Sequence, residues 1–105
     1  MKGKTNMKVI FGAPGSGKTK AILEESAKNN IPVLCENEAR VRRLLEKARG
    51  YGFNIPMPIT VDKLDGTVEK VYIDDIKRVL DVVLNTNLCG VTINSDDDLV
   101  VENLK

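Results

Sequence analysis

The chain contains no histidine, no tryptophan and only two cysteines, and these absences limit the kinds of site it can form. Cys35 and Cys89 are far apart rather than in a Cys-x-x-Cys pair, which together with the absence of histidine argues against a zinc site. Each cysteine lies in or beside an apolar run, so we expect buried, reduced thiols in a cytoplasmic protein. Aromatic residues make up only 4% of the chain, so Val, Ile, Leu and Ala must build the core.

Long apolar runs and a strong net charge are also missing. No run approaches the ~18 residues that a membrane-spanning helix needs. The basic start of the chain at 1–4 is not followed by the apolar stretch of a signal peptide. We therefore expect a cytoplasmic protein with no membrane partner. The net charge of +1 provides no overall field to attract nucleic acid.

The chain does contain short β-branched runs that alternate with helical patterns, which is typical of a parallel α/β sheet. Its 105 residues predict one domain, 1–105, with a core over 7–94. For the tail, 95–105, two predictions stay open: a helical turn after Ser95, or a further strand at 99–101. We expect strands at 7–11, 32–35, 59–61, 68–73 and 90–94, and helices at 18–28, between caps at Asn37 and Gly50, and at 76–84.

The strongest functional signal is the segment 12–19, which reads Gly-Ala-Pro-Gly-Ser-Gly-Lys-Thr. It matches the phosphate-binding loop Gly-x-x-x-x-Gly-Lys-Thr at every fixed position, between an expected strand and an expected helix. Glycines let backbone N–H groups approach phosphate oxygens, and the helix start adds the positive end of its dipole. Lys18 would place a cation on the β and γ phosphates, and the Thr19 hydroxyl would ligate Mg²⁺. The predicted nucleotide contacts are Gly12, Ala13, Pro14, Gly15, Ser16, Gly17, Lys18, Thr19 and Lys20.

A second signal is the apolar run 71–73, which ends in Asp74 and Asp75. Downstream of a phosphate loop, a strand that ends in a carboxylate is what a Walker B element looks like. Asp74 would hold Mg²⁺ through a water and pair with Thr19 across the site. Asp75 takes the place where many P-loop ATPases carry a Glu that orients the attacking water, so we predict Asp75 and Lys18 as catalytic residues. The alternative role of Asp75 is N-cap of the next helix, and the two roles are compatible.

With both motifs in place, the chain resembles the additional-strand class of P-loop ATPases. More narrowly, it resembles the minimal P-loop ATPase proteins encoded by phages and prophages. The order of its segments also resembles the first core domain of superfamily-one helicases. The resemblance runs over roughly 7–94 and implies a three-layer α/β/α fold with a five-stranded parallel sheet in the order 3-2-4-5-1. It also matches Cys35-Glu36-Asn37 at the end of the second strand, Thr60 and Leu64 around the third, and Asn94 or Ser95 at a polar sensor position.

The function we expect is binding of ATP with Mg²⁺, and hydrolysis that is slow or requires a protein partner or a second copy of the chain. Walker B reads Asp-Asp rather than Asp-Glu, a difference that bears on activation of the attacking water. No Asn-Lys-x-Asp motif for guanine occurs, which favours ATP over GTP. The resemblance implies a place in phage DNA metabolism. Two alternatives stay open: a regulatory module that senses ATP without hydrolysing it, and an accessory protein that binds nucleic acid.

The second expected helix is unusually basic. Its basic residues are Arg40, Arg42, Arg43, Lys47 and Arg49. The simplest interpretation is a solvated face opposite the apolar stripe. The alternatives are contact with nucleic-acid phosphates and an arginine that acts across a subunit interface, but no aromatic platform or second basic segment supports them. Since helices pack their apolar faces on the sheet, we expect these arginines and Arg78 to point away from their own phosphate loop.

Overall fold

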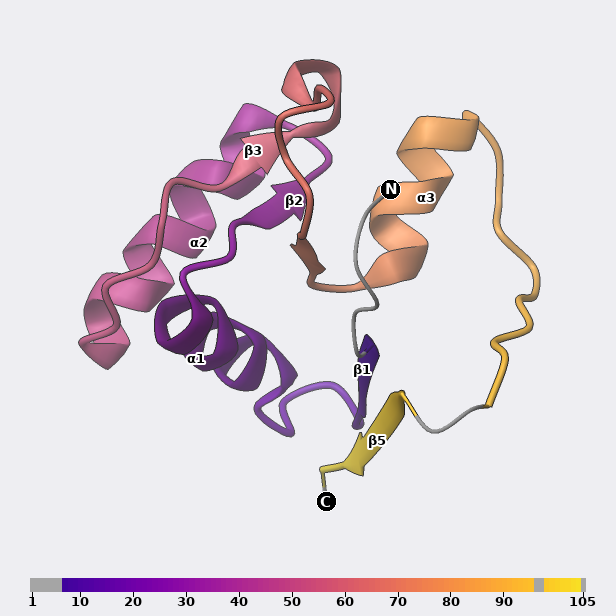
Figure 1. Cartoon of the computed structure of the whole chain (residues 1–105), viewed down its shortest axis with the longest axis horizontal. Coiled ribbons are helices and arrows are strands. Elements are labelled where there is room, and N and C mark those ends of the chain that lie inside the picture. Colours follow the sequence, from indigo (N-terminus) through magenta and orange to yellow (C-terminus); the bar gives the residue numbers. More distant parts are fainter. Residues whose placement is uncertain (1–6, 96–97, 105) are drawn as a thin grey trace.

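A computed structural model describes residues 7–95 and 98–104 of the chain. Strands and helices alternate along most of this length (Figure 1). The strands are β1 (Met7–Phe11), β2 (Val33–Cys35), β3 (Ile59–Thr60), β4 (Tyr72–Ile73) and β5 (Leu99–Asn103), and the helices are α1 (Lys18–Asn29), α2 (Glu38–Tyr51), the 3-10 helix η1 (Val61–Lys63) and α3 (Ile76–Leu84). Of the helices within these described ranges, none has both the length and the apolar character needed to cross a bilayer.

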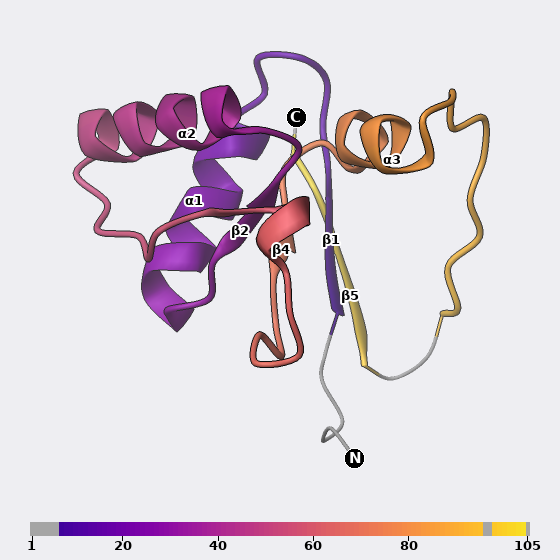
Figure 2. The ribbon, with the colours of Figure 1, turned by 90° about the horizontal axis from the view of Figure 1, so that it is seen from above.

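All strand pairs are parallel, and they form two small sheets. In the first sheet β2 lies between β3 and β4, with Leu34 opposite both Ile59 and Ile73. In the second sheet β5 runs beside β1, with Val9 opposite Val101. Figure 2 shows α1 and α2 on one side of the strands and α3 on the other. The prediction of an α/β protein with parallel sheets is therefore confirmed.

The core lies where α1 and α2 cover the three-stranded sheet. Leu23 of α1, Val33 of β2 and Leu44 of α2 are completely buried and belong to one cluster. Burying one such aliphatic side chain stabilises a fold by about 1.5–3 kcal/mol. All three residues of β2 are buried, which makes this strand the centre of the core. The aliphatic composition of the core matches the prediction from the scarcity of aromatic residues.

The two ends of α2 are set by particular residues. The side chain of Asn37 accepts a hydrogen bond of 2.9 Å from the Arg40 backbone N–H, which confirms Asn37 as the N-cap. The predicted C-terminal cap at Gly50 is wrong, because Gly50 is helical and the helix ends at Gly52, whose φ is 78°. Glycine adopts this left-handed conformation without strain, and the Phe53 N–H then bonds back to the Ala48 carbonyl at 2.8 Å.

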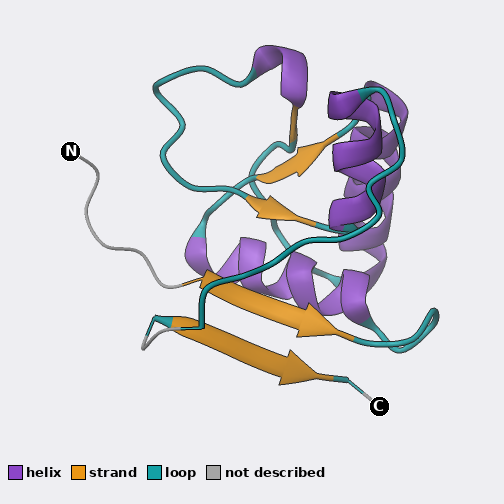
Figure 3. Ribbon diagram, turned by 90° about the vertical axis from the view of Figure 1, so that its right-hand side faces the viewer, coloured by secondary structure: helices purple, strands orange, loops and turns teal. Residues whose placement is uncertain are grey.

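The predicted single sheet in the order 3-2-4-5-1 is found only in part. The order 3-2-4 is present, but β1 belongs to the second sheet (Figure 3). Residues 90–94 form no strand, and Val91 and Ile93 are exposed. Leu99–Asn103 pairs with β1 instead, which is the strand alternative for the tail. A β-branched run becomes a strand only where a neighbouring strand offers unpaired backbone groups, and 99–103 takes that edge of β1.

Polar contacts fasten the second sheet to α1. The Lys8 ammonium lies 3.2 Å from Glu25 Oε1 on α1 and 3.4 Å from Glu102 Oε2 on β5. The Leu104 N–H donates to the Phe11 carbonyl at 2.7 Å, so the pairing continues to the end of β1. These contacts hold β5 beside the strand that leads into the glycine-rich segment.

Helix α3 covers the other side of the strands but buries little of its apolar surface. Only Val79 of this helix is buried, whereas Ile76, Val83 and Leu84 are about half exposed. The helical stripe predicted at 76–84 therefore forms the helix, and most of the stripe faces solvent in the single chain.

Candidate functional site

The segment between β1 and α1 forms a tight glycine loop. Gly15 and Gly17 have φ values of 81° and 97°, a left-handed conformation that favours glycine. The Ser16 N–H donates to the Ala13 carbonyl at 3.0 Å and closes a turn. A Cβ at Gly12 would collide with Ser16 Oγ and crowd Lys18 and Leu104, so a side chain here would force Ser16 to move. Gly12 and Gly17 are the fixed glycines of the predicted motif, and both have a structural reason to be glycine.

The start of α1 presents positive charge to this loop. Gly17 is its N-cap and supplies no side-chain cap, so the first N–H groups of the helix are left for another acceptor. The Lys18 ammonium folds over the loop and donates to the Ala13 carbonyl at 2.8 Å. The Lys20 ammonium instead lies 5.5 Å from the centre of the Tyr51 ring, so the group that Lys20 presents to the loop is its backbone N–H. The loop thus has the donors that an anion requires.

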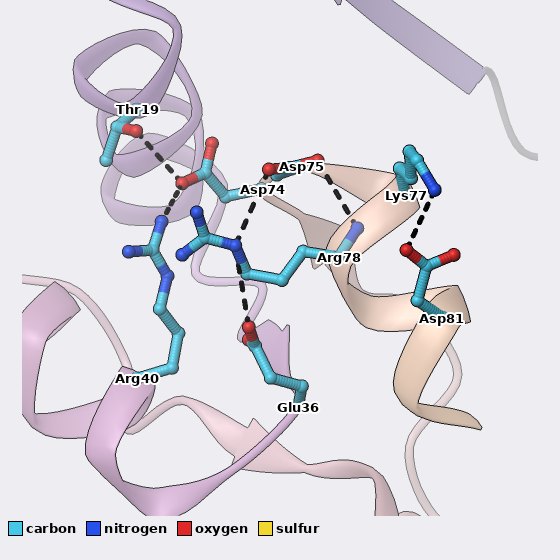
Figure 4. A network of polar contacts seen from close by, with 8 residues as sticks. All are labelled: Thr19, Glu36, Arg40, Asp74, Asp75, Lys77, Arg78 and Asp81. Carbon is cyan, nitrogen blue, oxygen red and sulfur yellow. Dashed lines mark hydrogen bonds and ion pairs between the residues drawn. The ribbon is translucent and has the colours of Figure 1, made fainter. Parts of the chain in front are cut away.

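Asp74 directly follows β4 and lies beside Thr19. Its Oδ2 accepts a hydrogen bond of 2.9 Å from Thr19 Oγ1, although the two residues are 55 positions apart (Figure 4). Asp74 is only 8% exposed. Mg²⁺ in nucleotide sites usually takes one or two protein oxygen ligands and completes its shell with phosphate oxygens and water. The hydroxyl and the carboxylate fit this role. Within 7–95 and 98–104, this site included, no three Cys, Asp or Glu side chains gather into a metal-binding group.

Arg40 reaches the same carboxylate, so the prediction that the arginines of α2 point away from the loop is wrong for this residue. Arg40 Nη2 lies 2.6 Å from Asp74 Oδ2, and its side chain is only 11% exposed. Asn37 caps α2 at the carboxyl end of β2, and the carboxyl ends of neighbouring parallel strands meet at one edge. The first turn of α2 therefore begins beside Asp74, and its side chains need not follow the solvated face of the later turns.

Asp75 caps the next helix and is paired with an arginine. It has a φ of 63°, and its carboxylate accepts a long hydrogen bond of 3.4 Å from the Arg78 backbone N–H. Arg78 Nε lies 3.5 Å from Asp75 Oδ2 and 3.7 Å from Glu36 Oε2. The N-cap role of Asp75 is confirmed, and its role as a base stays a prediction. Arg78 lies between two carboxylates at the site edge, which again differs from the expectation that it points away.

The other positions matched by the resemblance are placed as follows. Thr60 ends β3 opposite Cys35 and is 2% exposed, and its hydroxyl has no hydrogen-bond partner among the described residues. Leu64 is exposed. Asn94 and Ser95 are exposed and lie outside any strand, so the predicted sensor does not form at a strand end. The sensor prediction depended on a strand at 90–94, and it fails with that strand.

The two cysteines have opposite environments. Cys35 is buried in β2, and burial, together with the nearby negative charge of Glu36, raises its pKa to about 11. Cys89 is exposed, so the prediction of two buried thiols is wrong for Cys89. It adjoins the predicted strand 90–94, which would have covered it.

Two residues at the site edge were not predicted as site residues, Glu36 and Arg40. The Glu36 side chain is only 7% exposed, and Glu36 directly follows β2, whose neighbour β4 leads into Asp74. Its position after a buried strand was the available signal, because the carboxyl ends of parallel strands share an edge. For Arg40 the signal was the N-cap at Asn37, which places the first turn of α2 at that edge.

A surface hollow of about 330 Å³ lies elsewhere, at the C-terminal end of α2. It is lined by Leu45, Ala48, Arg49, Gly52, Phe53, Asn54 and Ile55. None of the loop residues lines it, so the candidate site is the glycine loop and the strand edge beside it.

Comparison of the chain with protein-family models, curated proteins and solved structures finds no match. The interpretation of the site therefore depends on these residues and their geometry.

Proposed function

We propose that the chain is a small P-loop domain of the additional-strand type that binds ATP together with Mg²⁺. The observation that carries the proposal is the hydrogen bond of 2.9 Å between Thr19 Oγ1 and Asp74 Oδ2. Each residue was assigned to Mg²⁺ from a separate motif, and two motifs that are unrelated in function would have no reason to meet. The parallel order β3-β2-β4 and the β1-loop-α1 connection also support this fold.

The roles follow from the positions of the groups. The backbone N–H groups of the loop and the Lys18 ammonium bind the β and γ phosphates. The Thr19 hydroxyl ligates Mg²⁺, and Asp74 holds the ion through a water. The ion would neutralise charge on the phosphates during phosphoryl transfer. Lys18 exchanges its bond to the Ala13 carbonyl for phosphate oxygens, which are stronger acceptors for an ammonium group.

Hydrolysis in the proposed enzyme is slow or depends on a partner. Asp75 orients the attacking water only after it gives up its contact with Arg78, which lies 3.5 Å away. This pairing also favours a second candidate function, a regulatory module that binds ATP and does not turn it over. In either case we place the protein in the cytoplasm and, by its resemblance, in phage DNA metabolism, where single-stranded DNA is a candidate partner.

Titration calorimetry with MgATP tests the binding step. We expect Lys18→Ala to abolish measurable binding and to leave the fold intact, because Lys18 is no part of the core. Lys28→Ala is the matched control, since Lys28 is exposed at the far end of the same helix and the charge change is the same. Unchanged affinity in Lys18→Ala would contradict the proposed function.

Phosphate release then separates hydrolysis from sensing. We expect a low rate for the chain alone and a higher rate with single-stranded DNA or at high protein concentration. ATP binding without release under any of these conditions would favour the sensing module.

A further inference from the structure

One oxygen atom of the site has two partners. Asp74 Oδ2 accepts from Thr19 Oγ1 at 2.9 Å and from Arg40 Nη2 at 2.6 Å (Figure 4). The Asp74 and Arg40 side chains are 8% and 11% exposed, so water screens the ion pair weakly. The carboxylate assigned to Mg²⁺ is thus already neutralised by a cation of the chain itself.

Arg40 and Mg²⁺ compete for the same place. A guanidinium stays charged at any pH that a protein tolerates, so Arg40 cannot give up its charge when a divalent ion arrives. A Mg²⁺ ion held by Asp74 through a water would still lie near the guanidinium, and two cations so close repel each other strongly in a poorly screened setting. Binding of a Mg²⁺–nucleotide complex therefore favours departure of the Arg40 guanidinium from Asp74.

We propose that Arg40 exchanges partners during binding. It holds Asp74 in the nucleotide-free chain and moves to the terminal phosphate of a triphosphate when Mg²⁺ takes its place. This inference rests on the proposed function. It assigns Arg40 a part in the discrimination between ATP and ADP that the sequence motifs did not give to this residue.

The terminal phosphate is the partner that the geometry offers. The guanidinium shares its carboxylate oxygen with Thr19. In the proposed site the Thr19 hydroxyl would ligate the metal ion that bridges the β and γ phosphates, so Arg40 would lie near the terminal phosphate. Guanidinium groups bind phosphate through paired hydrogen bonds, so the new contact replaces the lost one. With a diphosphate, Arg40 leaves Asp74 and finds no such acceptor, and an unpaired charge in a largely buried position is costly.

The test compares the affinities of the full chain for MgATP and MgADP by calorimetry. We expect the wild type to prefer MgATP, and Arg40→Gln to reduce the ratio of the two affinities about tenfold or more. The ratio falls for two reasons. The affinity for MgATP falls because a phosphate contact is lost, and the affinity for MgADP rises because MgADP no longer has to displace a cation. Arg40→Lys keeps a charge but not the paired hydrogen bonds, and should restore part of the preference.

Arg42→Gln is the control, because Arg42 is exposed on the same helix two positions away and does not share a face with Arg40. It should keep the wild-type ratio, and thermal unfolding should show that each variant is folded. An Arg40→Gln ratio equal to that of the wild type, even with both affinities lowered, would make Arg40 a structural ion pair and overturn the inference. A wild-type chain that binds neither nucleotide would contradict the proposed function itself, and the inference with it.

Discussion

The Asp74 carboxylate should act on a nucleotide mainly through the metal ion. Asp74→Asn keeps an oxygen that can accept from the Thr19 hydroxyl and removes the negative charge. We expect the affinity for ATP to fall about 10- to 100-fold in the presence of Mg²⁺, the usual effect of losing a residue that positions a metal through its outer shell. With the metal removed by EDTA, the loss of affinity relative to the wild type should be much smaller or absent. A loss of equal size with and without Mg²⁺ would mean that Asp74 has a structural role instead.

The thiols offer a check on the packing of β2. Burial raises the pKa of Cys35 to about 11, so at neutral pH almost none of it is the reactive thiolate. Cys89 is exposed. We expect a maleimide to modify Cys89 quickly at pH 7 and Cys35 only when the chain unfolds, with the modified peptide identified by mass spectrometry. Cys89→Ser should abolish the fast reaction, and fast labelling of Cys35 in the folded chain would contradict the buried position of β2.

At this scale the sequence predicted the loop better than its surroundings. The glycines of the loop, Lys18 and Thr19 follow each other directly, so a local motif was enough to identify them. The meeting of Thr19 with Asp74 was also predicted, because two known motifs implied it. Arg40 was missed because helical periodicity tells which residues share a face, but not that the first turn starts beside another strand's carboxylate.

Among the elements, α2 depends on its cap for both stability and function. Asn37→Ala removes the bond from the Asn37 side chain to the Arg40 N–H, which should cost about 1 kcal/mol of the free energy of unfolding. Urea denaturation measures this loss, and Asn37→Ser should recover most of it, since serine also caps helices well. An unchanged midpoint in Asn37→Ala would show that packing of the apolar face alone holds the start of α2.

The element predictions succeeded where the signal was local. The helices begin and end within a few residues of the predicted bounds, because caps and apolar spacing are read from neighbouring residues. Local signals could not decide which of the two runs, 90–94 or 99–103, forms the strand beside β1. Both runs contain consecutive β-branched residues, and the choice depends on which one reaches the edge of β1, a contact between distant parts of the chain. The same limit explains why the predicted strand 68–73 is reduced to Tyr72–Ile73.

For the whole molecule, exposed apolar side chains are the reason that we expect association. They include Ile76, Val82, Val83 and Leu84 on α3 and Val100 and Val101 on β5. Since β5 covers one edge of β1, these exposed side chains favour association through α3 or β5 over pairing of another chain with that edge. The exposed arginines of α2, Arg42, Arg43 and Arg49, are available to act across such a contact.

We therefore expect turnover per chain to rise with protein concentration. An arginine from a second chain would add to the proposed contact of Arg40 with the γ-phosphate, and Asp75 is tied to Arg78 in the single chain. Turnover should be measured over a wide concentration range, together with sedimentation velocity to follow assembly. A rate near ~1 s⁻¹, typical of a complete phosphotransfer site, that does not change on dilution would mean that Arg40 and Lys18 suffice within one chain.

The pairing of β5 with β1 has a practical consequence for where a tag or a label can be joined to the protein. Leu104 donates to the Phe11 carbonyl at 2.7 Å, and its Cβ would lie 3.2 Å from a Cβ at Gly12. An affinity tag, a surface anchor or a fluorescent label joined after residue 104 would emerge next to the phosphate loop. Met7 lies at the opposite end of β1, so attachment before it keeps that loop clear. Immobilised assays should use the N-terminal attachment, and a small dye at the C-terminal end would serve as a reporter of loop occupancy.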